Sequence, residues 1–313
     1  MPKAISADLL QKYSENYNNS TERQMATLAF SKTDINDVSF VSGRRKDTGF
    51  HFSVNIETLP VTNQEATGRC WLFSATNVLR ERIAKTLNVD NFELSQSYLA
   101  FWDKFERANS FMENIIATAD RPADERNVAF ILMTGVHDGG QWEMFANIVR
   151  KYGIVPKAAF NETYQSSHSR SVNHYLNRAL KKEAAVLRKM VQNGASTESV
   201  TAEKNAMLDK VYSFLCSCYN EPPCVFDLEY TDKDKQYHLV ENLTPQKFYE
   251  EYIGDLLDQT VSVINAPTKD KEYHNTYTIR YLTNVVGGHD VVHLNLTMEE
   301  MKNAIIAQLK DGK

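Results

Sequence analysis

The feature that most constrains the fold is a helix that begins directly after a glycine-containing loop. The loop covers residues 62–69, holds Gly68, and ends where a helical pattern starts at Cys70. Apolar residues then recur at helical spacing, at Leu72, Ala75, Leu79 and Ile83. Such a stripe must be buried against other elements, so the sequence predicts a helical lobe behind Cys70.

The composition is that of a globular protein. The chain has 313 residues, 42% of them hydrophobic and 24% charged, and this length suggests two domains or one domain with an insertion. The net charge of −5 favours neither a nucleic acid nor an anionic membrane as partner. The longest wholly apolar run, 128–133, is far short of the about 20 residues of a membrane span. Residues 1–8 hold no apolar core of a secretory signal.

The four cysteines divide into Cys70, which stands alone, and Cys216, Cys218 and Cys224, which lie close together. Without a signal peptide a disulfide framework is not expected, and we predict a reducing cytoplasm as the location. The C-x-C-x₅-C spacing lacks the C-x₂-C pair of common zinc sites, so we predict neither metal nor cofactor. Zinc ligation stays an alternative; the simpler interpretation is that these three pack as small buried residues near a helix end.

Helical patterns and turn signals divide the rest of the chain. Shorter helical patterns cover 6–17, 91–105 with Ser95 as N-cap, 142–151 before Gly153, and the residues after Thr244-Pro245. Two longer ones, at 177–193 and 201–218, predict a helical hairpin inserted into a larger domain.

The pattern turns to β over residues 273–296, where Tyr277, Ile279 and Tyr281 alternate with polar residues. Thr297 and Glu300 then form a capping box that opens a last helix. We therefore predict four segments. They are an N-terminal extension with an incoming strand (1–61), a helical lobe with the nucleophile (62–176), the inserted hairpin (177–225), and the start of a β-rich lobe (226–313).

Cys70 is the candidate nucleophile because cysteine reacts as the thiolate, which helix N-termini favour. Its backbone N–H would be free to hold a developing oxyanion, and the side-chain amide of Gln64, six residues earlier, could return as a second donor. The alternative interpretation is a buried cysteine beside a surface glutamine.

Residues 63–75, NQEATGRCWLFSA, closely resemble the nucleophile segment of the papain superfamily, and GRCW resembles its bleomycin hydrolase/aminopeptidase C branch. The resemblance implies Cys70 as nucleophile, Gln64 as oxyanion-hole amide, and Trp71 beside the catalytic site. Residues 138–142, DGGQW, resemble the segment whose glycines, here Gly139 and Gly140, bind extended substrate through the main chain. A simple turn is the alternative for this glycine pair. Residues 94–95, 151–156 and 281–288 continue the similarity.

A cysteine peptidase also needs a histidine base and usually an Asn or Asp to orient it. None of the eight histidines lies in the family's histidine motif, and no asparagine lies in an Asn-Ser-Trp sequence. His289 and His293 are four residues apart, but in a β-like segment this spacing has no meaning as a ligand pair. We therefore expect an incomplete papain-like α+β fold whose catalytic His and Asn lie outside this chain.

The resemblance implies a cysteine-type aminopeptidase that hydrolyses peptide bonds near the N-terminus of peptide substrates by acyl-enzyme chemistry at Cys70. It also implies a homo-oligomer, in particular a hexamer. This chain alone would then be inactive. The alternative is a catalytically silent binding or assembly subunit of the same fold.

Overall fold

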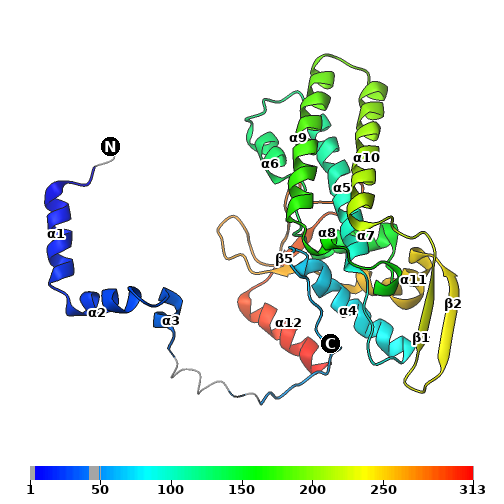
Figure 1. Cartoon of the computed structure of the whole chain (residues 1–313), viewed down its shortest axis with the longest axis horizontal. Coiled ribbons are helices and arrows are strands. Elements are labelled where there is room, and N and C mark those ends of the chain that lie inside the picture. Colours follow the sequence, from blue (N-terminus) through cyan, green and yellow to red (C-terminus); the bar gives the residue numbers. More distant parts are fainter. Residues whose placement is uncertain (1–3, 42–48, 50, 313) are drawn as a thin grey trace. The chain divides into compact units, whose positions relative to one another are not determined.

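The structure is a computed structural model that describes residues 4–41, 49 and 51–312 (Figure 1). The chain divides into two compact units, Met1–Asn55 (unit 1) and Ile56–Lys313 (unit 2). Residues 1–3, which belong to the segment predicted to hold no secretory signal, lie outside the described residues, as do 42–48 and 50 of the predicted N-terminal extension.

Unit 1 consists of short capped helices: α1 (Ala7–Asn18), α2 (Thr21–Phe30) and α3 (Ile35–Ser39). The helix predicted over 6–17 is confirmed as α1. The residues that follow, for which the sequence predicted no helix, form α2 and α3, because Ser20 and Asp34 accept backbone hydrogen bonds as N-caps.

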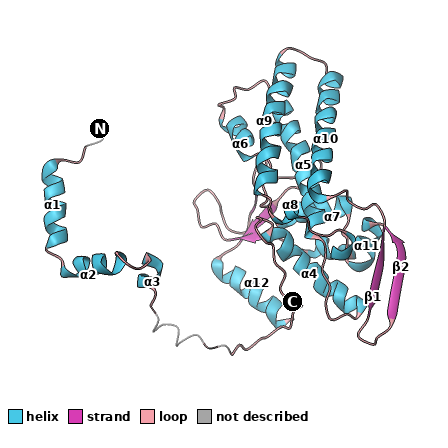
Figure 2. Cartoon of the chain, viewed as in Figure 1, coloured by secondary structure: helices cyan, strands magenta, loops and turns pink. Residues whose placement is uncertain are grey.

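Unit 2 is mainly helical, with two small sheets (Figure 2). Its α-helices are α4 (Cys70–Leu87), α5 (Gln96–Ala117), α6 (Arg126–Thr134), α7 (Trp142–Tyr152), α8 (Tyr164–Ser167), α9 (Arg170–Gln192), α10 (Thr197–Tyr219), α11 (Pro245–Tyr252) and α12 (Met298–Lys310). Short 3₁₀ turns cover Lys157–Ala159 (η2) and Gly254–Gln259 (η3). The strands are β1 (Phe226–Thr231), β2 (Tyr237–Leu243), β3 (Val263–Ile264), β4 (Thr276–Thr278) and β5 (Val292–Asn295).

Helix α5 is the centre of unit 2 and packs against α4, α6, α7, α9 and α10. Ser95 caps it as predicted, since its hydroxyl accepts the N–H of Tyr98. The helix continues well past Phe105, where the sequence pattern had ended, because its partners cover it on several sides and bury even charged side chains.

The predicted helical hairpin is confirmed as α9 and α10, which stand side by side in Figure 1. Both helices start earlier than expected, at Arg170 and Thr197. Their buried stripes face α5 and each other, and consist of Val172, Leu176, Leu180, Ala184 and Leu187 on α9 and Val200, Met207, Val211 and Leu215 on α10.

The strands correct part of the sequence interpretation. Strands β1 and β2 form an antiparallel hairpin within the segment predicted to begin the β-rich lobe, although its strands had not been located. The second sheet has the order β3-β5-β4, with β3 parallel and β4 antiparallel to β5. The predicted alternation through Tyr281 is wrong beyond Thr278, because Tyr281 takes a positive φ of 64° in a turn.

Among the residues that the structure describes, none of the helices is both long enough and apolar enough to cross a membrane.

Candidate active site

Cys70 is the first residue of α4, and its side chain is exposed. The backbone carbonyl of Arg69 accepts the N–H groups of Leu72 and Phe73, so the helix starts directly at the cysteine. The first N–H groups of a helix have no acceptor within it, so the N–H of Cys70 itself can face an anion beside the thiol.

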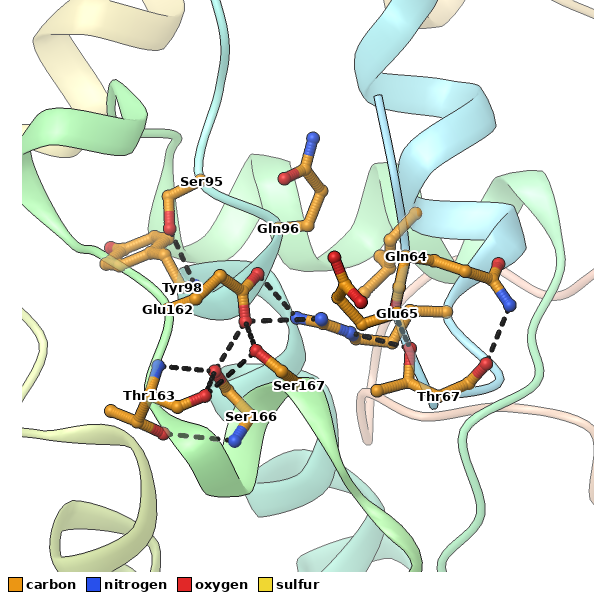
Figure 3. A network of polar contacts seen from close by, with 12 residues as sticks. Gln64, Glu65, Thr67, Ser95, Gln96, Tyr98, Glu162, Thr163, Ser166 and Ser167 are labelled. Atoms are coloured by element: carbon orange, nitrogen blue, oxygen red, sulfur yellow. Dashed lines mark hydrogen bonds and ion pairs between the residues drawn. The ribbon is translucent and has the colours of Figure 1, made fainter. Parts of the chain in front are cut away.

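The turn before Cys70 holds Gln64 by two reciprocal hydrogen bonds. The amide Nε2 of Gln64 donates to the carbonyl of Thr67 at 2.6 Å, and the hydroxyl of Thr67 donates to the carbonyl of Gln64 at 2.7 Å. Both residues lie together in Figure 3. Since a carboxamide has two N–H donors, one fixes its orientation and the other remains for a ligand.

The buried Arg69 anchors this turn from inside the protein. Its side chain is 2% exposed, and its guanidinium binds both carboxylate oxygens of Glu162, at 3.0 and 3.2 Å. Its Nε donates to the Thr67 hydroxyl at 3.1 Å. The hydroxyls of Ser166 and Ser167 donate to the same carboxylate, so the pair joins the nucleophile loop to α8.

The predicted glycine pair lies against Trp71, the residue after the thiol. The indole Nε1 of Trp71 donates to the carbonyl of Asp138. A Cβ atom on Gly140 would lie 2.6 Å from the indole ring, whereas one on Gly139 would meet its nearest atom, on His137, at 3.6 Å. Glycine is therefore required at 140 for close packing, and residues 138–140 form a wall against Trp71, the residue that follows Cys70.

Asp138 connects this wall to the nucleophile loop. Its carboxylate accepts the N–H of Gly68 at 3.1 Å, the ammonium of Lys104 at 2.6 Å, and hydrogen bonds from Ser169 and Asn173. Burial raises the pKa of Asp138, but the charge and hydrogen bond of Lys104 and the other donors outweigh it, so the pKa lies well below its usual range.

A second buried ion pair on α5 supports the same wall. Arg107 pairs with Asp103 at 2.7 Å and donates to the carbonyl of Gly139 at 2.6 Å. It also contacts His137, whose pKa is lowered by burial and then by the neighbouring Arg107 charge. The main chain at Gly139 is thus held by a buried cation.

Six of the described histidine side chains have polar partners other than Cys70. His289 pairs with Glu143 at 3.3 Å, and buried His293 shares a hydrogen bond of 2.7 Å with Ser262. In the part of the chain that the structure describes, none of the hydrogen bonds of a histidine ring leads to Cys70. Within the same residues, His, Cys, Asp and Glu form no group of three or more that could hold a metal ion.

The cysteines correct one expectation. All four lie in the described part of the chain and are free thiols. Cys216 and Cys218, on α10, are half-buried, and burial raises the pKa of both thiols. Cys224 is exposed, because it follows the end of α10 rather than packing on it, so its expected burial is wrong.

Sequence reasoning gave no role to the charged residues that hold the site: Arg69, Lys104, Arg107, Asp138 and Glu162. One signal could have found some of them. Residues 103–107, DKFER, place four charges close together inside an apolar helical pattern. Four charged residues so close together on a helix cannot all face solvent once one side of the helix is buried, so some of them must face the core. The partners of these charges lie far away in sequence, so the pattern alone could not identify them.

Comparison with known proteins defines the class first: unit 2 has the fold of a papain-like peptidase. The crystal structure of PepW from Lactobacillus rhamnosis superposes with a TM-score of 0.97 at 42% identity, covering 100% of this chain and 70% of that one. A family model described as the Peptidase C1-like family matches residues 4–313. The chain belongs to this family.

Two relatives show the range of the family. Aminopeptidase C of Lactobacillus delbrueckii subsp. lactis is 44% identical over 313 residues, which are 100% of this chain and 70% of the relative. Bleomycin hydrolase of Homo sapiens is 40% identical over 268 residues, which are 84% of this chain and 59% of the relative. The resemblance found in the GRCW segment therefore extends over the chain.

Proposed function

We propose that the full-length protein is a cysteine aminopeptidase with Cys70 as its nucleophile. The observation that carries the proposal is an exposed thiol at the first residue of α4, beside the wall of Trp71 and Gly140. The names of the relatives, aminopeptidase C and bleomycin hydrolase, support hydrolysis of amide bonds.

The chemistry is acyl transfer in two steps. The Cys70 thiolate attacks the scissile carbonyl carbon, and the carbonyl oxygen becomes an oxyanion held by the Cys70 N–H and the free N–H of Gln64. Collapse breaks the C–N bond, the amine leaves with a proton from the histidine base, and a thioester remains. Water then hydrolyses the thioester and restores the thiol.

Gly139 and Gly140 would bind the extended substrate through their main chain, with Trp71 packed behind them. This role is supported by two hydrogen bonds to the main chain, from the Trp71 indole to the Asp138 carbonyl and from Arg107 to the Gly139 carbonyl. A main-chain segment fixed in this way would hold the substrate carbonyl within reach of the thiol, which lowers the entropic cost of reaction.

We place the catalytic histidine and its asparagine partner outside residues 1–313. The proposal is supported by the engagement of His289 with Glu143 and of His293 with Ser262. It is also supported by relatives that extend beyond the matched region. The division into segments 1–61, 62–176, 177–225 and 226–313 belongs to the same proposal.

Two further parts of the proposal concern the setting of the enzyme. Its free thiols suit a reducing compartment such as the cytoplasm. A homohexamer follows from the family resemblance, with the N-terminal helix α1 and the α9–α10 hairpin as contact elements. Light scattering of the full-length protein at micromolar concentration tests this assembly, and a monomer would contradict it.

The central experiment measures fluorophore release from an aminoacyl amide by three proteins: the full-length enzyme, residues 1–313, and full-length Cys70→Ser. We expect turnover only by the first, because proton transfer by the base contributes about 10²–10⁴ in rate and the nucleophile is indispensable. Turnover by residues 1–313 would refute the placement of the base. If the full-length protein showed no turnover, the alternative hypothesis of a binding or assembly subunit would be favoured.

A further inference from the structure

We propose that Thr67, Arg69 and Glu162 are positioning residues that hold the Gln64 carboxamide in place for the oxyanion. This inference rests on the function proposed above, and adds three side chains that touch neither the thiol nor the substrate. Figure 3 shows Gln64, Thr67 and Glu162 in one continuous network of polar contacts.

The first link is the pair of hydrogen bonds between Gln64 and Thr67. The Gln64 amide donates to the Thr67 carbonyl, and the Thr67 hydroxyl donates to the Gln64 carbonyl. The side chain of each residue thus binds the backbone carbonyl of the other. A glutamine side chain has three rotatable bonds, so without these contacts its free N–H would rarely point to one place.

The second link is the hydroxyl of Thr67. While it donates to Gln64, it accepts a hydrogen bond from Arg69 Nε at 3.1 Å. One hydroxyl therefore joins the glutamine turn to the guanidinium. Valine has nearly the same shape as threonine and removes both bonds at once.

The third link is the ion pair of Arg69 with Glu162, which uses all three guanidinium nitrogens together with the Thr67 contact. A lysine cannot make this planar contact, because its ammonium is a single point of charge. Glu162 is itself fixed by Ser166, and the carbonyl of Ser167 accepts the N–H of Ala66 at 3.0 Å. The turn is therefore tied to α8 through both side chains and main chain.

This arrangement predicts which kinetic constant responds. Oxyanion donors act on charge that exists only in the transition state, so misplacing one lowers kcat and leaves KM nearly unchanged. Loss of a merely structural contact would instead lower stability and the amount of folded enzyme, and its effect on kcat would not depend on whether Gln64 is present.

The experiment is a double-mutant cycle in the full-length enzyme between Gln64→Ala and Thr67→Val. Removing Gln64 should lower kcat by about 10²–10³, as for other oxyanion donors. Thr67→Val should lower kcat by about threefold to tenfold with KM unchanged, because the turn loses both bonds of the Thr67 hydroxyl while the Gln64 amide keeps its bond to the Thr67 carbonyl. In the Gln64→Ala background the same change should lower kcat by less than about twofold, because its target is gone.

Thr86→Val is the matched control, since the Thr86 hydroxyl donates only to the Arg82 carbonyl on the exposed face of α4. It should leave kcat unchanged. Glu162→Gln and Arg69→Lys should reproduce the Thr67→Val effect and its dependence on Gln64. Circular dichroism shows whether each variant is folded. If one variant does not fold, the double-mutant cycle with Gln64→Ala is measured with the others.

The outcomes separate this inference from the proposed function. Equal effects of Thr67→Val with and without Gln64, or a wild-type kcat in Thr67→Val and Glu162→Gln, would overturn the inference alone. An unchanged kcat in Gln64→Ala would instead overturn the assignment of Gln64 as oxyanion donor, and the inference with it.

Discussion

The two sides of unit 2 differ in how they bury their side chains. The helical side, made of α4, α5, α7, α9 and α10, has a continuous apolar core and encloses the ion pairs Lys104–Asp138 and Arg107–Asp103. The strand side, made of β3, β4, β5 and α12, buries fewer side chains. Every described residue of α12 is exposed or half-buried, including the large apolar Met298, Ile305, Ile306 and Leu309.

This difference shows where the geometry of the candidate site originates. Cys70, Trp71 and the glycine pair all lie on the helical side, where buried charges fix main-chain atoms. A buried charge is stable only when its partner group is in place, so few arrangements of these side chains are possible. The helical side should therefore respond strongly to single substitutions, and α12 weakly.

The largest effect on stability is expected for Lys104→Met. The change leaves the Asp138 carboxylate without its cation in a buried site, and should lower the free energy of unfolding by about 3–5 kcal/mol. Lys271→Met is the control, because its pair with Asp270 is exposed and should contribute less than about 1 kcal/mol. Urea denaturation measures both; similar losses would remove the contrast between buried and exposed pairs.

Next in size is Gly140→Ala. The added Cβ would lie 2.6 Å from the Trp71 ring, so the wall must shift, at a cost of about 1–3 kcal/mol, and KM for the substrate should rise. Gly139→Ala has room and should change stability by no more than about 0.5 kcal/mol. Thermal unfolding and steady-state kinetics of the two variants test this, and equal behaviour would count against the packing of Gly140 on Trp71.

The charge of Asp138 predicts a dependence on pH. Because its folded pKa lies below the unfolded value, its stabilisation is complete above the ordinary aspartate pKa of about 4 and is lost as the pH falls further. Asp138→Asn should therefore cost about 1–2 kcal/mol at pH 7, and the difference from wild type should shrink towards pH 3. A difference that stayed constant with pH would show that the carboxylate charge does not matter.

The smallest effect is expected on α12. Ile306 is 48% exposed, so Ile306→Ser in the 313-residue protein should change the free energy of unfolding by no more than about 0.5 kcal/mol. Leu79→Ala, at a fully buried position of α4, should cost about 2–5 kcal/mol in the same assay. A large decrease in the free energy of unfolding for Ile306→Ser would mean that the apolar face of α12 is covered.

Local chemistry explains what the sequence could predict. The starts of α4, α5, α11 and α12 were located because caps, proline and apolar stripes act within a few residues. The glycine that ends α7, Gly153, was found for the same reason. Cys70, Gln64 and the glycine pair came from a specific motif rather than from periodicity.

Tertiary partners explain what it could not. The Arg69–Glu162 contact joins positions 93 residues apart, and Gly68–Asp138 joins positions 70 apart. No periodic pattern contains that information. The hairpin of β1 and β2 was missed because β2 is largely exposed and shows no clear apolar face, although Phe226 and Leu228 alternate with exposed residues as a half-buried strand requires.

The same separations have a consequence for the order of folding. Helices α9 and α10 meet through a short connection, so they can pair early, whereas the contacts around Cys70 must close long loops first. We expect the reactive thiol to reach its final surroundings late, after the scaffold has formed. Pulsed hydrogen exchange during refolding should then protect α9 and α10 before the amides of Ala66 and Gly68, and the reverse order would exclude this sequence of events.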